Sequence, residues 1–302
     1  MKIIIHANRI DWQQAYLPRF TAGFVAHGHR VVHSDEDKAD ESGINVIFAN
    51  NSWKLVHQQC INKHIPLITV GRCMFGSRHD MVAIGWDGFN GVADFCLDDE
   101  MPDDRWQKHG HSLTSVRYGD ADGYVLVCGE FREMGKWYGA MREILAGEDV
   151  CFRPHPFKTG QAVPGWRFAR KVGQDDLSSL FPDCRVVITY DSIAGCDAVL
   201  AGVPSIACGE NSMARPVSFN SWRHFRKFYE DGLPDETEGK MSKPQWANRL
   251  AYCQWSHDEI EAGDFWTHLL KGCETRMESA NAHAHLSKTT KMRKHHRLMG
   301  WN

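Results

Sequence analysis

Residues 186–206 read VVITYDSIAGCDAVLAGVPSI, and this stretch predicts a strand, a turn and a helix in that order. The β-branched run at 186–189 is typical of a buried strand. A strand that passes directly into a helix leaves main-chain N–H groups and the positive end of the helix dipole at the turn. We therefore expect the turn around Ser192 and Gly195 to bind phosphate, with Asp197 accepting hydrogen bonds from a ribose. An ordinary turn capped by Ser192 is the alternative.

A second motif, Arg153-Pro154-His155-Pro156, follows the apolar run at 150–152. The prolines on both sides of His155 fix the backbone and so hold the imidazole in place. Arg153 adds a fork of donors that suits a phosphate or a carboxylate. Alone, the motif could be a rigid surface turn that contains a histidine. Together with the turn at Ser192, it indicates a site for a nucleotide diphosphate.

The order of these two motifs resembles the C-terminal domain of GT-B glycosyltransferases, and most closely the capsule-polysaccharide and phage-encoded members. The resemblance implies that the His-Pro element and the serine-containing turn hold the diphosphate of a nucleotide-sugar, expected to be a UDP-sugar. Nucleotide-sugar epimerases and teichoic-acid polymerases share much of this pattern. The residues that we assign to the donor site are Gly129, Arg132, Arg153, His155, Tyr190, Asp191, Ser192, Gly195 and Asp197.

Strand-like and helix-like segments alternate along the chain, at residues 2–5, 12–26, 44–48, 53–62 and 67–70 and again at 124–128, 137–146 and 150–152. This alternation predicts an α/β protein with two doubly wound, Rossmann-like domains. The chain of 302 residues is long enough for two such domains. By resemblance we expect a GT-B architecture, in which the two domains face a cleft and the C-terminal helices cross back. The expected ranges are an acceptor-binding domain at 1–120, a nucleotide-sugar domain at 121–243, C-terminal helices at 244–286 and a basic tail at 287–302.

The composition excludes several classes of protein. No apolar run approaches the roughly 20 residues of a membrane span, and the N-terminus reads as a first strand rather than a signal peptide. The ten cysteines are scattered singly, which argues against a zinc site or a disulfide framework and favours a reducing cytoplasm, that of the host if the protein is phage-encoded. We expect no cofactor and no essential divalent metal; the sequence does not indicate an oligomeric state.

A glycine-rich polar stretch, with the segments 71–80 and 84–91, follows the predicted strand at 67–70 and so lies at the sheet edge where open α/β sheets bind ligands. A polar surface loop is the alternative. For an inverting transfer, a carboxylate here would deprotonate the acceptor hydroxyl. Asp80 is the first candidate and Asp87 the second, and His79 could orient the acceptor or replace them. The residues that we expect to contact the acceptor are Asn8, Trp12, Arg72, Arg78 and Trp86.

The C-terminal residues 279–302 carry five Lys and Arg residues and no acid. A short basic tail is commonly a solvated terminus, but it could also attract a polyanion. With the resemblance to phage-encoded enzymes, this tail suggests DNA as a partner. The expected activity is a hexosyl- or pentosyltransferase that acts on a hydroxymethylated pyrimidine flipped out of phage DNA. The alternatives are a glycosyltransferase for a capsule or surface saccharide and a nucleotide-sugar 2-epimerase.

Overall fold

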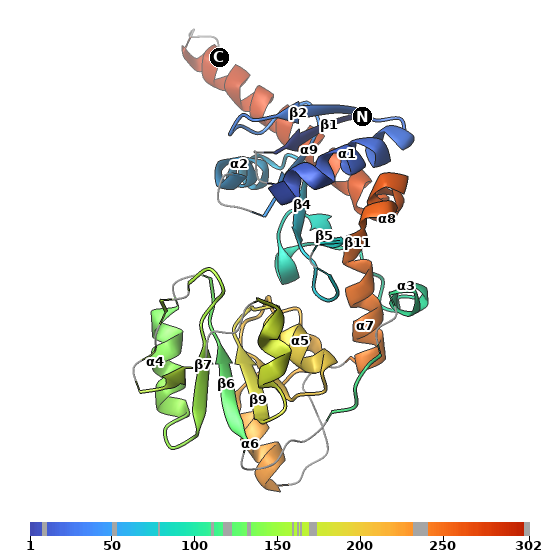
Figure 1. Cartoon of the computed structure of the whole chain (residues 1–302). Coiled ribbons are helices and arrows are strands. Elements are labelled where there is room, and N and C mark those ends of the chain that lie inside the picture. Colours follow the sequence, from blue (N-terminus) through green and yellow to red (C-terminus); the bar gives the residue numbers. More distant parts are fainter. Residues whose placement is uncertain are drawn as a thin grey trace. The chain divides into compact units, whose positions relative to one another are not determined.

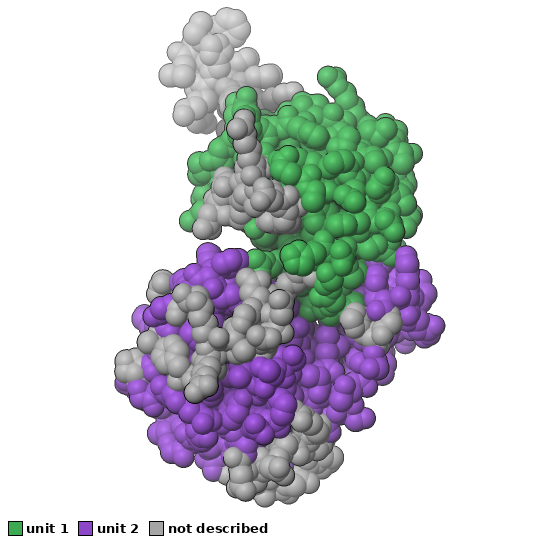
Figure 2. All heavy atoms as spheres, in the orientation of Figure 1, with its two compact units in different colours: residues 1–99, 252–302 green, residues 100–251 purple. Residues whose placement is uncertain are grey.

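The computed structural model describes residues 1–7, 11–49, 53–77, 79–109, 112–116, 123–131, 134–158, 160–161, 163, 165–168, 174–231 and 241–298. The chain forms two compact units, which Figure 2 colours separately. Unit 1 consists of residues 1–99 and 252–302, and unit 2 of residues 100–251. This division differs from the expected ranges at both crossings, because the chain enters unit 2 about twenty residues earlier and returns to unit 1 about eight residues later.

Unit 1 contains a six-stranded sheet in the order β11-β5-β4-β3-β1-β2 (Figure 1). The strands are β1 (Lys2–His6), β2 (Arg30–Ser34), β3 (Ile44–Phe48), β4 (Leu67–Arg72), β5 (Met81–Trp86) and β11 (Gln254–Ser256). The first four are parallel, whereas β5 runs antiparallel to both β4 and β11. The helices of this unit are α1 (Asp11–Ala26), α2 (Lys54–Lys63), α8 (His257–Ala262) and α9 (Asp264–Leu298), with a short 3-10 turn η2 (Asn90–Val92).

Strand β5 corrects the expectation of a long polar loop at 71–91. Its sequence MVAIGW is apolar and every one of its residues is buried. A Cβ on Gly85 would lie 2.9 Å from the ring of Phe95. Glycine at this position therefore allows the Phe95 side chain to pack directly against β5. The glycines and charged residues on either side of the apolar run hide it in the sequence. Strands β4 and β5 therefore form a β-hairpin, and the polar residues lie in the turn that connects them and after the end of β5.

The C-terminal part of the chain returns to unit 1, as expected. Strand β11 extends the sheet, and α9 packs its aromatic residues against α1: Phe265 lies 5.3 Å from Phe20 and 5.1 Å from Phe24 between ring centroids. Gly23 lets α8 approach α1 closely, because a Cβ there would lie 2.1 Å from the carbonyl oxygen of Ile260. Residues 287–298 of the expected basic tail are the last part of α9, and residues 299–302 lie outside the described residues.

Unit 2 contains a five-stranded, fully parallel sheet in the order β10-β9-β6-β7-β8. The strands are β6 (Tyr124–Cys128), β7 (Val150–Arg153), β8 (Arg167–Phe168), β9 (Cys184–Thr189) and β10 (Ser205–Ala207). The helices are α3 (Asp104–Lys108), α4 (Gly135–Ile144), α5 (Ala194–Leu200), α6 (Trp222–Asp231) and α7 (Lys243–Tyr252), with 3-10 segments η3 (Gln174–Leu180) and η4 (Arg215–Val217). The predicted doubly wound fold is thus present in both units. No helix within the described ranges combines the length and the apolar character needed to span a membrane.

Candidate functional site

The strand order of unit 2 reverses at β6. From β6 the chain moves outward to β7 and β8, and it then returns to the other side of β6 as β9 and β10. Open α/β sheets bind ligands outside the carboxyl ends of the strands at such a reversal. The described donor residues predicted from the sequence lie at or just after the ends of β6, β7 and β9 or in the first turn of α5, so the fold brings them to one edge. They are Gly129, Arg153, His155, Tyr190, Asp191, Ser192, Gly195 and Asp197.

Gly129 joins the ends of β6 and β7. Its N–H donates to the carbonyl oxygen of Arg153 at 2.8 Å. A Cβ at this position would lie 2.8 Å from the main-chain nitrogen of His155 and 2.7 Å from Oε1 of Gln161. Contacts this short with backbone atoms do not occur for real Cβ atoms, so only glycine lets the two turns lie this close.

Glu130 occupies the turn that we expected to bind phosphate. Its Oε1 accepts hydrogen bonds from the main-chain N–H groups of Tyr190 and Asp191 at 3.0 Å each and of Ser192 at 3.1 Å. The side chain is only 8% exposed, and this burial raises its pKa, against the opposing effect of the three N–H donors. The prediction that these N–H groups receive a ligand phosphate is therefore corrected. The carboxylate of Glu130 accepts these hydrogen bonds instead. A motif made only of residues that are close in the sequence does not reveal this interaction.

The remaining features of the β9–α5 turn agree with this correction. The hydroxyl of Ser192 accepts from the N–H of Ala194 at 3.3 Å within the turn, but the N-cap of α5 is Ile193, which has no side-chain cap hydrogen bond. Helix α5 has only seven residues, which limits the dipole that its first turn can present. The cationic and neutral donors for a phosphate at this edge are then mainly on the β7 side.

Arg153 and His155 provide those donors. Nε of Arg153 is buried and has no hydrogen-bond partner among the described residues. Nδ1 of His155 accepts the N–H of Phe157 at 3.2 Å, so the neutral ring carries its proton on Nε2 and presents that nitrogen as a donor. The backbone around His155 is thus fixed by hydrogen bonding as well as by the two prolines.

In unit 1, the first-choice base lies at the carboxyl edge of the parallel strands. Asp80 and His79 immediately precede β5 and are exposed, as is Arg72 at the end of β4. The carbonyl oxygen of Asp80 accepts the N–H of His257 at 3.2 Å, and that of His79 accepts the hydroxyl of Tyr16 at 3.2 Å. These two contacts tie the turn before β5 to α1 and α8.

Sequence reasoning missed His257, the first residue of α8. Its ring lies 4.5 Å from that of Tyr16 in an edge-on arrangement, and burial lowers its pKa. The signal that could have pointed to it is the sequence Ser256-His257-Asp258-Glu259, which forms a capping box at the start of α8. Asp80, His79, Tyr16 and His257 therefore form one polar cluster.

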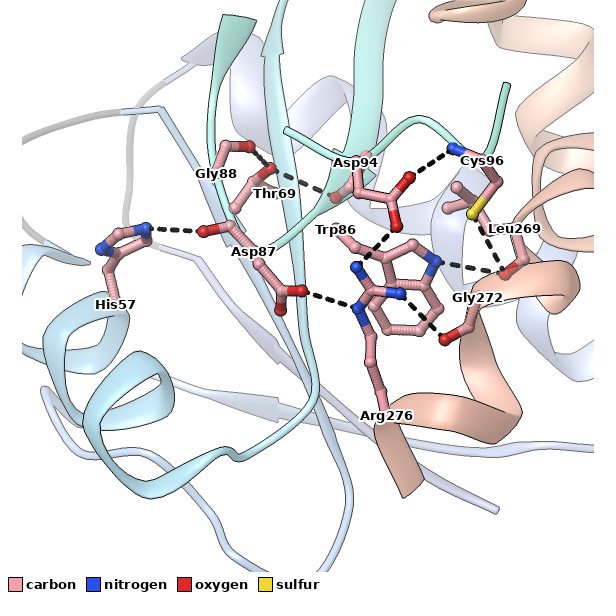
Figure 3. A network of polar contacts seen from close by, with 11 residues as sticks. His57, Thr69, Trp86, Asp87, Gly88, Asp94, Cys96, Leu269, Gly272 and Arg276 are labelled. Carbon is pink, nitrogen blue, oxygen red and sulfur yellow. Dashed lines mark hydrogen bonds and ion pairs between the residues drawn. The ribbon is translucent and has the colours of Figure 1, made fainter. Parts of the chain in front are cut away.

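Asp87 and Trp86 lie elsewhere. Because β5 is antiparallel, its end lies beside the start of β4, and the N–H of Asp87 donates to the carbonyl oxygen of Leu67. Figure 3 shows Arg276 of α9 bridging two carboxylates, with 2.7 Å from its Nε to Asp87 and 2.8 Å from its Nη2 to Asp94. Asp87 is thus on the opposite edge of the sheet from Asp80, and the two do not share a site.

Trp86 is fully buried, which corrects its assignment to the acceptor. Its Nε1 donates to the carbonyl oxygen of Leu269 at 3.1 Å, and the guanidinium of Arg276 lies 5.0 Å from its ring centre (Figure 3). The Trp86 ring therefore has a structural role, because it anchors α9 to the sheet. Of the other predicted residues, Asn8, Arg78 and Arg132 lie outside the described residues, and so does the side chain of Trp12. Within the described ranges, no three His, Cys, Asp or Glu residues gather as metal ligands would.

The fold is similar to that of known GT-B proteins. No protein-family model and no curated protein matches the chain. The beta-Kdo 2,4 transferase KpsC of Thermosulfurimonas dismutans has a TM-score of 0.50 at 10% identity, covering 84% of this chain and 90% of its own. The beta-Kdo 2,7 transferase KpsC of the same organism has a TM-score of 0.51 at 11% identity, with 87% and 97% covered. The UDP-N-acetylglucosamine 2-epimerase from Rickettsia bellii has a TM-score of 0.36 at 11% identity, with 89% and 95% covered. The likeness to the two KpsC structures shows the fold, two Rossmann-like domains as in GT-B glycosyltransferases.

Proposed function

We propose that this protein is a glycosyltransferase that moves a sugar from a nucleotide-sugar to an acceptor hydroxyl. The observation that supports the donor site is the meeting of Arg153, His155 and Gly129 at the carboxyl edge of β6 and β7, beside the reversal of strand order. Negative charge grows on the leaving phosphate as the sugar–phosphate bond breaks. Fixed donors at that position stabilise the transition state more than the ground state. The proposal therefore requires no divalent metal.

The Glu130 carboxylate limits which hydrogen-bond donors at this edge can bind the phosphates. It holds the N–H groups of residues 190–192, so these donors serve the turn itself. The groups that we propose to bind the phosphates are the guanidinium of Arg153, Nε2 of His155 and the hydroxyl of Ser192. Prolines 154 and 156 keep His155 from rotating away, which preserves the geometry between ground state and transition state.

On unit 1, Asp80 is the proposed base. It is exposed at the ligand edge of its sheet, next to His79 and to the cluster of Tyr16 and His257. Asp87 is not equivalent, because Arg276 pairs with it at the other edge. Burial raises the pKa of Asp87, but its carboxylate is held in place by Arg276 and lies away from the carboxyl edge of the parallel strands.

For the acceptor, we propose a saccharide hydroxyl rather than DNA. Trp86 is buried, so one of the residues expected to contact a flipped base cannot reach it. The expected polar loop is a buried strand, so fewer polar groups face an acceptor at this edge. The names of the two KpsC structures, both Kdo transferases, point in the same direction. DNA remains the outcome to be tested against this proposal.

The test is donor binding and transfer with a panel of UDP-, CMP- and GDP-sugars. His155→Ala and Ser192→Ala should each weaken donor binding in calorimetry while leaving the protein folded. Asp80→Asn should leave donor binding near normal and reduce transfer by about two to four decades, because the amide cannot accept a proton. Asp87→Asn is the matched control and should retain transfer.

Four results would contradict the proposal. Unchanged donor affinity in both His155→Ala and Ser192→Ala would remove the nucleotide from this edge. Full activity of Asp80→Asn would place the base elsewhere. Conversion of the donor in the absence of any acceptor would indicate a 2-epimerase instead, and salt-sensitive retention of duplex DNA would restore DNA as the acceptor.

A further inference from the structure

Two phenylalanine side chains next to His155 are exposed on the surface of unit 2. Phe131 is 47% exposed and Phe157 is 60% exposed, and no other Phe or Trp side chain that the structure describes is as exposed. The ring of His155 lies 5.5 Å from that of Phe131 and 5.7 Å from that of Phe157, between centroids. The ammonium group of Lys158 lies 5.8 Å from the centre of the Phe131 ring. We call Phe131, Phe157 and the histidine between them the aromatic surface.

The position of the aromatic surface is set by the fold. Phe131 follows the end of β6, and Phe157 follows the end of β7, two neighbouring strands that pair in parallel. Both rings are therefore at the carboxyl edge of the sheet, next to the reversal of strand order where ligands bind. A single exposed apolar side chain is ordinary, but two aromatic rings grouped around one histidine at a ligand edge call for a ligand that covers them.

We propose that the aromatic surface stacks the nucleobase of the donor, beside the phosphates at Arg153 and His155; this subsite rests on the proposed function. A nucleobase offers a flat π face to phenyl rings, and stacking of this kind tolerates any base. The transferred sugar is a poorer match, because its hydroxyls need hydrogen-bond partners and phenyl rings provide none. Lys158 supplies positive charge at the rim, which suits a base attached to a phosphate.

The experiment compares UDP, GDP and inorganic pyrophosphate as ligands of the full chain, by calorimetry. Phe131→Ala and Phe157→Ala should each reduce the affinity for UDP and GDP by about 5- to 100-fold, the range expected for loss of one stacked ring. Affinity for pyrophosphate should not change, because it has no base. Phe157→Tyr should restore nucleotide affinity, whereas Phe157→Leu, which is apolar but not aromatic, should not. Ile144→Ala on α4, an exposed apolar residue at 46%, is the matched control and should bind like the wild type.

Each other result overturns the subsite. An equal loss for pyrophosphate would mean that the rings only support His155. A loss for the nucleotide-sugar but not for the free nucleotide would assign the rings to the sugar. A leucine variant as good as phenylalanine would rule out stacking. A wild-type protein that binds no nucleotide would overturn the proposed function and the subsite together. Weaker nucleotide binding in His155→Ala with unchanged binding in both Phe131→Ala and Phe157→Ala would overturn only the subsite.

Discussion

Glu130 should stabilise unit 2 through the three main-chain N–H groups that it accepts. Glu130→Leu removes the acceptor and leaves the N–H groups of residues 190–192 facing an apolar side chain. A buried donor without a partner costs about 1–3 kcal/mol, so three of them at the low end give a loss of about 3 kcal/mol. That is a large part of the 5–15 kcal/mol typical of a domain. Glu130→Gln keeps an amide oxygen of the same reach and should lose less than about 1 kcal/mol.

Urea unfolding of the wild type and the two variants, followed by circular dichroism, measures these differences. The pH dependence separates the charge from the hydrogen bonds. Burial raises the pKa of Glu130 above its ordinary 4.5, so the folded protein holds the proton to higher pH than the unfolded chain. The wild type should therefore lose stability relative to Glu130→Gln as the pH rises from 4.5 through the raised pKa.

Two outcomes would refute this reasoning. A Glu130→Leu protein as stable as the wild type would show that the three N–H groups are satisfied in another way. A wild type that gains stability over Glu130→Gln with rising pH would show that the N–H donors outweigh burial, and that the folded-state pKa is depressed rather than raised.

Three further predictions test other parts of the structure. Gly129→Ala should cost about 1–3 kcal/mol and weaken nucleotide binding, because its Cβ would lie 2.8 Å from the main-chain nitrogen of His155; unchanged unfolding and calorimetry would contradict this. Arg276→Lys should cost about 1–2 kcal/mol in thermal unfolding, since one ammonium cannot replace the fork that reaches Asp87 and its neighbouring carboxylate, and a fully stable variant would show that the fork is dispensable. Asp40, whose pKa its lysine partner lowers to about 2, should add under about 1 kcal/mol of stability above pH 3.8 that disappears as the pH falls through 2; Asp40→Asn should lack this change, and an identical acid profile would count against the pair.

Local sequence predicted the elements of this fold well where a buried strand runs directly into a turn. The apolar run at 186–189 lies within β9, and those at 44–48 and 124–128 coincide with β3 and β6. These strands are buried on both faces, so their sequences are continuously apolar and stand out from their surroundings. Strand β5 was missed because its six apolar residues are bounded by glycines and charges that are typical of loops.

The same strand explains why the two candidate bases could not be separated by sequence. Asp80 and Asp87 are close along the chain, but an extended strand rises about 3.3 Å per residue, so β5 carries them roughly 20 Å apart. Whether such a segment is a loop or a strand depends on burial against distant residues. Trp86 illustrates this, since its partner Leu269 lies on α9.

Glu130 was missed for a related reason, and it changes how the donor site is understood. Its three donors come from residues about sixty positions later, so no local motif contains both sides of the interaction. A carboxylate buried beside a phosphate site repels the phosphate, and Arg153 must offset that repulsion for a nucleotide to bind. Glu130→Gln keeps the acceptor and removes the charge, so it should bind UDP more tightly than the wild type, while Glu130→Leu, which disturbs the turn, should bind it more weakly. If Glu130→Gln instead binds UDP more weakly, the carboxylate is needed for more than holding the turn, and the phosphates do not lie next to it.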